Sequence, residues 1–177
     1  MRAVPSRLVP MLAVLVVPAL TAAGLAAKPL STTGRAQGAP TLELIGLNGQ
    51  HRAVGRAELA KLPHVDIAAS SHGVEGKYRG VPLGELLRLV DRPAGDALRG
   101  KALATAVSVE ATDGYRVIFA LAEVDSGFSN KVIVLADAKN GAPLDSAEGP
   151  LRVIVPDEKR PARWAKNVVR IRLVAIE

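Results

Sequence analysis

Cysteine is absent from the 177-residue sequence, which excludes disulfides, thiol redox chemistry, cysteine nucleophiles and thiolate zinc sites. Aromatic residues make up only 3% of the chain, whereas single-stranded nucleic acids are bound largely by stacking on aromatic side chains. The net charge of +6 is a mild excess, below what a basic nucleic-acid-binding face requires. Stability must therefore come from packing, and we expect no nucleic-acid partner.

Long apolar runs are also scarce, and the only extended one lies near the N-terminus. Arg2 and Arg7 come first, residues 8–20 are almost entirely apolar, and small residues follow as far as Ala27. This three-part layout is typical of a secretory signal peptide, and the run is shorter than the about 20 residues of a membrane span. An uncleaved membrane anchor is the alternative, because no charge interrupts residues 8–27.

The two arginines are not adjacent, so we expect Sec-type export of an unfolded chain to the periplasm or the medium. After cleavage the protein would have no membrane association. The expected organisation is a signal peptide over residues 1–27, a flexible leader over 28–40 and one domain over 41–177.

Short strands with tight turns dominate the remaining sequence. Asn48-Gly49 between two alternating segments predicts a hairpin, and Ser70–Arg79 has the polar, glycine-rich composition of a loop. Most turns are too short for parallel crossovers, so we expect an α+β fold with a mixed, mainly antiparallel sheet. The expected strands are 42–47, 50–54, 65–69, 107–110, 115–119, 132–136, 151–155 and 169–173, with short helices at 56–62 and 82–90.

No standard catalytic motif is present. The sequence lacks G-x-S-x-G, a P-loop and a dinucleotide fingerprint, and its three histidines lack metal-ligand spacing. Ser70, Ser71 and His72 are consecutive, so their side chains diverge and do not form a nucleophile–base pair. A cationic loop, residues 159–166, contains Arg163, Trp164 and Lys166. It could hold a phosphate or sulfate, or it could be a solvated loop that aids solubility.

An ordered set of motifs resembles the oxidoreductase molybdopterin-binding domain found in sulfite oxidases and related periplasmic reductases. The resemblance covers about residues 41 to 177. Its motifs are Tyr-Arg-Gly-Val-Pro-Leu-Gly-Glu-Leu-Leu at 78–87, Ala-Thr-Asp-Gly-Tyr at 111–115, Asn-Gly-Ala-Pro-Leu at 140–144, Gly-Pro-Leu-Arg-Val-Ile-Val-Pro at 149–156 and Trp-Ala-Lys-Asn-Val-Val at 164–169.

The resemblance implies an α+β fold with a mixed sheet and a pterin cofactor held through its phosphate. It implies that Arg152 contacts the pterin, that Trp164–Lys166 is the last stretch to contact the cofactor, and that Asp113 and Tyr115 border the metal pocket. Arg163 lies in the same cationic loop.

The family's molybdenum-ligating cysteine is replaced here. Its expected window, near the end of the strand before the Gly-Val-Pro-Leu segment, is Ala-Ala-Ser-Ser at residues 68–71, followed by His72. A neutral serine hydroxyl does not substitute for a soft thiolate without deprotonation.

Two hypotheses follow. The first is a periplasmic molybdopterin-dependent oxidoreductase with a serine or no protein ligand to molybdenum. The second is a non-catalytic descendant that keeps the cleft and uses it for a small anion, a pterin or an envelope protein partner. We expect no metal ligated by protein side chains.

Overall fold

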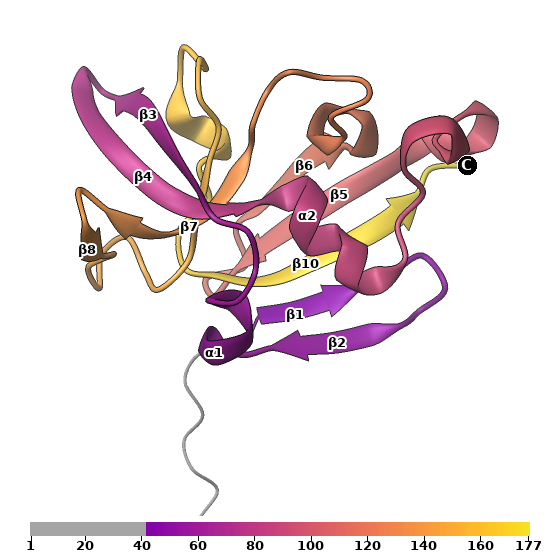
Figure 1. Cartoon of the computed structure of the whole chain (residues 1–177), viewed down its shortest axis with the longest axis horizontal. Helices are drawn as coiled ribbons and strands as arrows, with labels where there is room; N and C mark the ends of the chain where they lie inside the picture. The colour runs from indigo at the N-terminus through magenta and orange to yellow at the C-terminus, as the bar shows by residue number, and fades with distance from the viewer. Residues whose placement is uncertain (1–41) are drawn as a thin grey trace, which may run out of the picture. The chain divides into compact units, whose positions relative to one another are not determined.

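The computed structural model describes residues 42–177, which form two β-sheets with a few short helical segments (Figure 1). In the first sheet the strand order is β2-β1-β10-β5-β6, with bounds β1 Leu42–Ile45, β2 His51–Val54, β5 Thr105–Ala111, β6 Arg116–Ala120 and β10 Val168–Ala175. In the second the order is β3-β4-β7-β8, with β9 also paired to β7 and with bounds β3 Val65–Ser71, β4 Val74–Pro82, β7 Val134–Lys139, β8 Ala142–Pro143 and β9 Arg152–Ile154.

Local and distant pairings build the first sheet. Asn48-Gly49 closes the β1–β2 hairpin as predicted, with Gly49 at a positive φ of 76°. β1 also pairs in parallel with β10, so that Leu44 lies opposite Ile171. The other strand pairs are antiparallel. The predicted α+β class with a mixed, mainly antiparallel sheet is confirmed.

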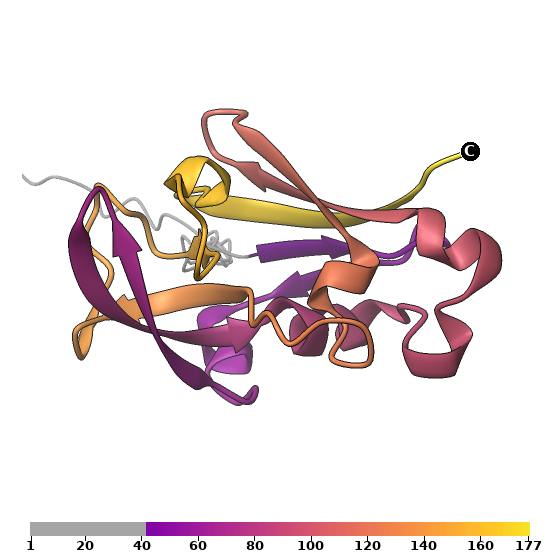
Figure 2. The same cartoon turned by 90° about the horizontal axis from the view of Figure 1, so that it is seen from above.

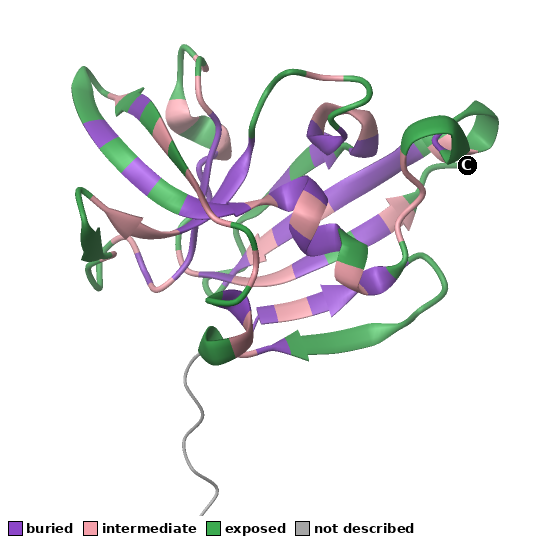
Figure 3. Ribbon diagram, viewed as in Figure 1, coloured by how far each residue is buried: buried purple, intermediate pink, exposed green. Residues whose placement is uncertain are grey.

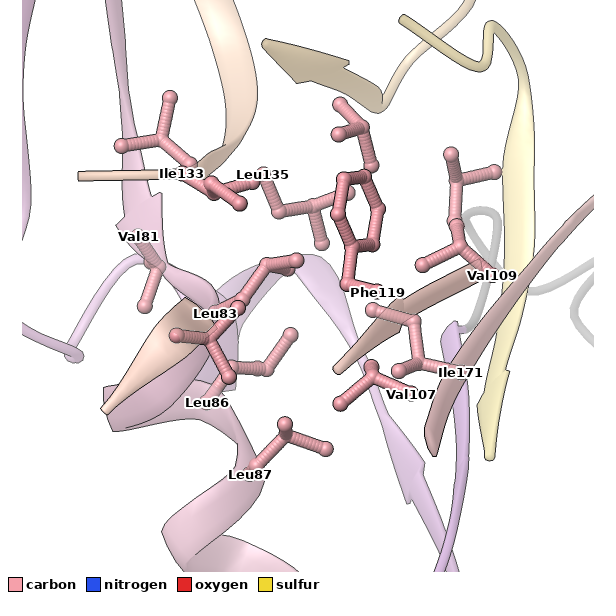
Figure 4. Packing of buried hydrophobic residues seen from close by; sticks show 14 of the residues in the cluster. Val81, Leu83, Leu86, Leu87, Val107, Val109, Phe119, Ile133, Leu135 and Ile171 are labelled. Atoms are coloured by element: carbon pink, nitrogen blue, oxygen red, sulfur yellow. The ribbon is translucent and has the colours of Figure 1, made fainter. Parts of the chain in front are cut away.

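One hydrophobic core joins the two sheets (Figure 4). Helix α2, Leu83–Leu87, continues into the 3₁₀ turn η1, Arg88–Val90, and buries the apolar stripe that its sequence predicts. Phe119 and Leu135, from opposite sheets, belong to the same cluster. The other helical segments are α1 Arg56–Leu59, η2 Gly95–Ala97, η3 Gly100–Ala104, η4 Leu121–Val124 and η5 Pro161–Arg163.

The predicted loop at 70–79 is wrong, because most of this segment is strand β4 of a long hairpin with β3. Two glycines of β4 lie close to neighbouring groups. A Cβ at Gly80 would lie 2.3 Å from the carbonyl oxygen of Leu135 in β7, and one at Gly76 would lie 3.0 Å from the ring of Tyr78 in the same strand and 3.3 Å from Lys139 Cε in β7. Figure 3 shows the alternating burial along β4 that this packing produces.

The predicted signal peptide, residues 1–27, and leader, residues 28–40, lie outside the described residues. Within residues 42–177, no helix has the length and apolar character needed to cross a membrane.

Candidate functional site

The tip of the β3–β4 hairpin carries three of the predicted site residues. His72 and Gly73 both have positive φ, 52° and 78°, which is the geometry of a two-residue type I′ turn. Ser70 is exposed and Ser71 is half-buried, because consecutive strand residues point to opposite faces. The two hydroxyls therefore diverge, as the sequence predicted for these neighbouring side chains.

A second element, which we call the strap (residues 156–163), follows β9. Two side-chain hydrogen bonds fix the strap: Trp164 Nε1 donates to the Val155 carbonyl at 2.9 Å and so joins the two residues that flank it, and Tyr115 Oη donates to the Ala162 carbonyl at 2.6 Å near its end. These bonds hold the chain on either side of Pro161, so the cationic residues before it project from a supported segment.

Arg163 helps to anchor the strap. Its Nε donates to Glu158 at 2.8 Å and its Nη1 to Glu123 at 3.1 Å, while the guanidinium lies 4.5 Å from the ring centroid of Phe119. Burial opposes the charged form, but the hydrogen bonds that Arg163 donates to Glu158 and to Glu123 outweigh it and raise the pKa of Arg163. This arginine is committed to contacts within the protein.

A cleft of about 630 Å³ separates the hairpin tip from the strap, and Figure 2 shows these two segments from above. Ser70, His72 and Gly73 form one wall, and residues 158–162 form the other. Lys159 and Arg160 are exposed and make no ion pair with any described residue. The cleft therefore has two available cations facing a hydroxyl and an imidazole, a set that suits a small oxyanion.

A second cavity, of about 420 Å³, lies on the other side of Pro161 and Ala162. It brings together four predicted residues from two parts of the chain, Asp113, Tyr115, Trp164 and Lys166. Asp113 Oδ1 accepts from the Tyr115 amide at 2.9 Å, which shapes the turn.

Arg152 is buried, with 5% of its surface exposed. Its Nη1 donates to Glu148 at 2.6 Å, and Lys139 donates to the same carboxylate at 3.1 Å. The guanidinium lies 5.4 Å from the centroid of Trp164, whose ring meets Tyr78 edge-on at 5.8 Å. The Nε atom of Arg152 has no partner in the described part of the chain. Its charge is already balanced by Glu148, so Arg152 supports Trp164 from inside the fold.

Sequence reasoning did not select Lys159, Arg160 or Glu148 as site residues. The first two lie in the cationic loop that the sequence singled out, and their position before Pro161 was the available indication. Arg152 lies only four residues after Glu148, but Lys139 reaches the same carboxylate only through the pairing of β7 with β9, which the sequence does not show.

A molybdopterin cofactor would need a phosphate site and a ligand for the metal. The strap cations and Lys166 have the charge that a pterin phosphate needs. The donor set for molybdenum does not match, since thiolate is missing and the two serines point to opposite faces of β3. Among residues 42–177, no three His, Asp or Glu side chains gather as metal ligands.

Comparison with known proteins places this geometry in context. Residues 41–177 match the family described as the oxidoreductase molybdopterin binding domain. The crystal structure of the sulfane dehydrogenase SoxCD from Paracoccus pantotrophus is similar in fold, with a TM-score of 0.60 and 19% sequence identity. The similarity covers 77% of this chain and only 38% of the SoxCD chain. No curated protein matches the chain.

Proposed function

Because the chain belongs to the oxidoreductase molybdopterin-binding domain family, we propose that it is an exported member that binds an anionic ligand between the hairpin tip and the strap. In this proposal the domain keeps the family fold but does not perform molybdenum redox catalysis. Two observations together support the proposal: the chain has no cysteine, and its cleft is lined by Lys159 and Arg160, two cations without an ion-pair partner among the described residues.

The case against a standard molybdenum centre rests on coordination chemistry. Thiolate is the soft donor that stabilises such metals, and its expected window ends in Ser70 and Ser71. Export adds to the case: Arg2 and Arg7 are separated, which favours transport of an unfolded chain, and an unfolded chain does not carry a buried cofactor. The alternative is an oxidoreductase whose cofactor is held without sulfur from the polypeptide, which family membership favours.

The case for an anion site rests on the cleft walls. Lys159 and Arg160 have no carboxylate partner among the described residues, whereas Arg163 beside them has two. The ligand charge would therefore meet cations that are not already neutralised. His72 and Ser70 supply polar groups from the opposite wall. A phosphate or sulfate group, free or on a pterin, fits this chemistry.

The test uses the full mature protein, recovered from the periplasm of a host that makes molybdenum cofactor. We expect substoichiometric molybdenum by elemental analysis. Pyrophosphate at ten times its Kd should raise Tm by about 4 °C relative to chloride of equal ionic strength. The double variant Lys159→Ala/Arg160→Ala should lose that rise.

The matched control is Arg99→Ala/Lys101→Ala, which removes two exposed cations from the unrelated segment around η3 and should keep the full rise. One molybdenum per chain would refute the expected absence of a molybdenum centre and favour the oxidoreductase alternative. Equal melting in pyrophosphate and chloride would refute the anion site.

A further inference from the structure

The turn at the hairpin tip determines which groups of β3 face outward. In a two-residue hairpin the residues flanking the turn form a hydrogen-bonded pair, here Ser71 with Val74. Bonded and non-bonded pairs then alternate along antiparallel strands, and the β3–β4 register has no shift. The pair formed by Ser70 and Glu75 is therefore non-bonded, and so is every second pair after it.

Three residues of β3 consequently direct both N–H and C=O away from β4: Asp66, Ala68 and Ser70. β3 is the edge of its sheet, and no backbone partner within residues 42–177 receives these six groups. All three residues are exposed. The strand has no proline, bulge or lysine, and Asp66 is its only charged residue, so it has few of the features with which proteins usually protect an edge from pairing.

Charge differs between the two ends of this edge. Lys159 and Arg160 lie across the cleft from Ser70. Asp66 lies four residues earlier, about 13 Å away along a strand. An incoming strand would therefore meet positive charge at the Ser70 end and negative charge at the Asp66 end. The strap bounds the cleft opposite β3, so the space next to Ser70 admits a single extended segment more readily than the edge of another folded sheet.

We propose that β3 receives an extended peptide segment of a partner protein as an added strand, with an acidic side chain of that segment against Lys159 and Arg160. This inference rests on the proposed anion site, because the same two cations receive the carboxylate. Main-chain bonds to Asp66, Ala68 and Ser70 supply affinity, and the cations select the acidic residue. The anion of the proposed function is thus a carboxylate carried on a peptide.

The test is amide hydrogen exchange by NMR on the full mature chain. The probe is the acetylated peptide Thr-Val-Thr-Val-Glu-Glu, and the control peptide has Lys in place of both Glu. We expect the amides of Asp66, Ala68 and Ser70 to exchange quickly alone and to become protected with the acidic peptide. The amides of Ile67 and Ala69, bonded to β4, should be protected throughout. The lysine peptide should bind about tenfold more weakly.

Two proline variants separate this proposal from the anion site. Ala68→Pro removes an outward N–H and leaves the hydrogen bonds between β3 and β4 in place. Edge strands tolerate proline at such positions. It should abolish peptide binding and keep the Tm rise with pyrophosphate. Ala53→Pro is the matched control, since Ala53 is the corresponding outward-facing residue of β2, the edge of the other sheet. It should leave both unchanged.

Three results would overturn the proposal. The first is unchanged exchange of the three amides at saturating peptide. The second is protection without peptide that disappears on dilution, which would mean that two copies of the chain pair through β3. The third is protection without peptide at every concentration, which would mean that the chain covers its own edge. Loss of the pyrophosphate effect alone, with amide protection retained, would refute the anion site and remove the selection for acidic peptides.

Discussion

At the scale of single residues, the buried ion pair between Arg92 and Asp125 has a large expected effect on stability. Their atoms lie 2.6 Å apart, and the side chains are 4% and 5% exposed. The hydrogen bond from Arg92, together with the Gly127 amide, outweighs burial and lowers the pKa of Asp125. Removing one partner leaves the other as an uncompensated buried charge, so Asp125→Asn should cost about 3–5 kcal/mol in free energy of unfolding at pH 7.

The same pair gives a pH dependence of known sign. Because the folded-state pKa of Asp125 is lowered, its contribution is complete above the unfolded value of about 3.9 and is lost as pH falls further. Urea unfolding should therefore show a gap between the natural chain and Asp125→Asn that is full at pH 7 and shrinks below about pH 4. Glu85→Gln, which breaks an exposed pair with Arg88 at 3.4 Å, should cost at most about 0.5 kcal/mol. An equal cost for both variants would contradict the expected role of burial.

At the scale of elements, the contact between β4 and β7 depends on a glycine. A Cβ at Gly80 would lie 2.3 Å from Leu135 O and 2.5 Å from Ala136 Cα, both backbone atoms that have little freedom to move. Gly80→Ala should therefore push the strands apart and cost about 2–3 kcal/mol. Gly55→Ala has open space around the new methyl group and serves as the control. Chemical denaturation measures both, and a Gly80→Ala cost as small as that of Gly55→Ala would show that β4 and β7 separate freely.

The sequence correctly predicted the elements that are determined by residues close together in the chain. Asn48-Gly49 closes its hairpin, and the stripe from Leu83 to Val90 is buried as its spacing indicates. The segment after Ser70 was wrongly predicted as a loop because glycine usually marks turns, whereas Gly76 and Gly80 are strand residues selected by their neighbours in space. A pattern within one segment carries no information about such neighbours.

In the candidate site, too, the sequence predicted some features, and others depend on the fold. The cationic loop was visible because its charges are contiguous, and the structure places Lys159 and Arg160 on a cleft wall. Nothing in the sequence distinguishes these available cations from Arg163 and Arg152. Those two are paired with Glu158 and Glu148, and the second pairing depends on how β9 packs.

At the scale of the whole described domain, the first sheet is complete only when strands from the two ends of residues 42–177 pair with each other. β1 pairs with β10, and Arg170 Nε bonds Glu43 across 127 residues of sequence. The core is one cluster that includes strands from both sheets. Neither sheet therefore has a separate core to retain after the other is lost, and the domain should unfold as one cooperative unit.

Trp164 makes this expectation measurable, because it is the only tryptophan and is buried near the strap, far in sequence from β1. Urea unfolding followed by its fluorescence should coincide with unfolding followed by far-UV circular dichroism, with one midpoint and one slope. Leu44→Ala, at the buried centre of β1, should lower the free energy of unfolding by about 2–5 kcal/mol. Both urea midpoints should fall together. If the tryptophan midpoint stayed in place while the dichroism shifted, the sheets would unfold separately and the shared core would not couple them.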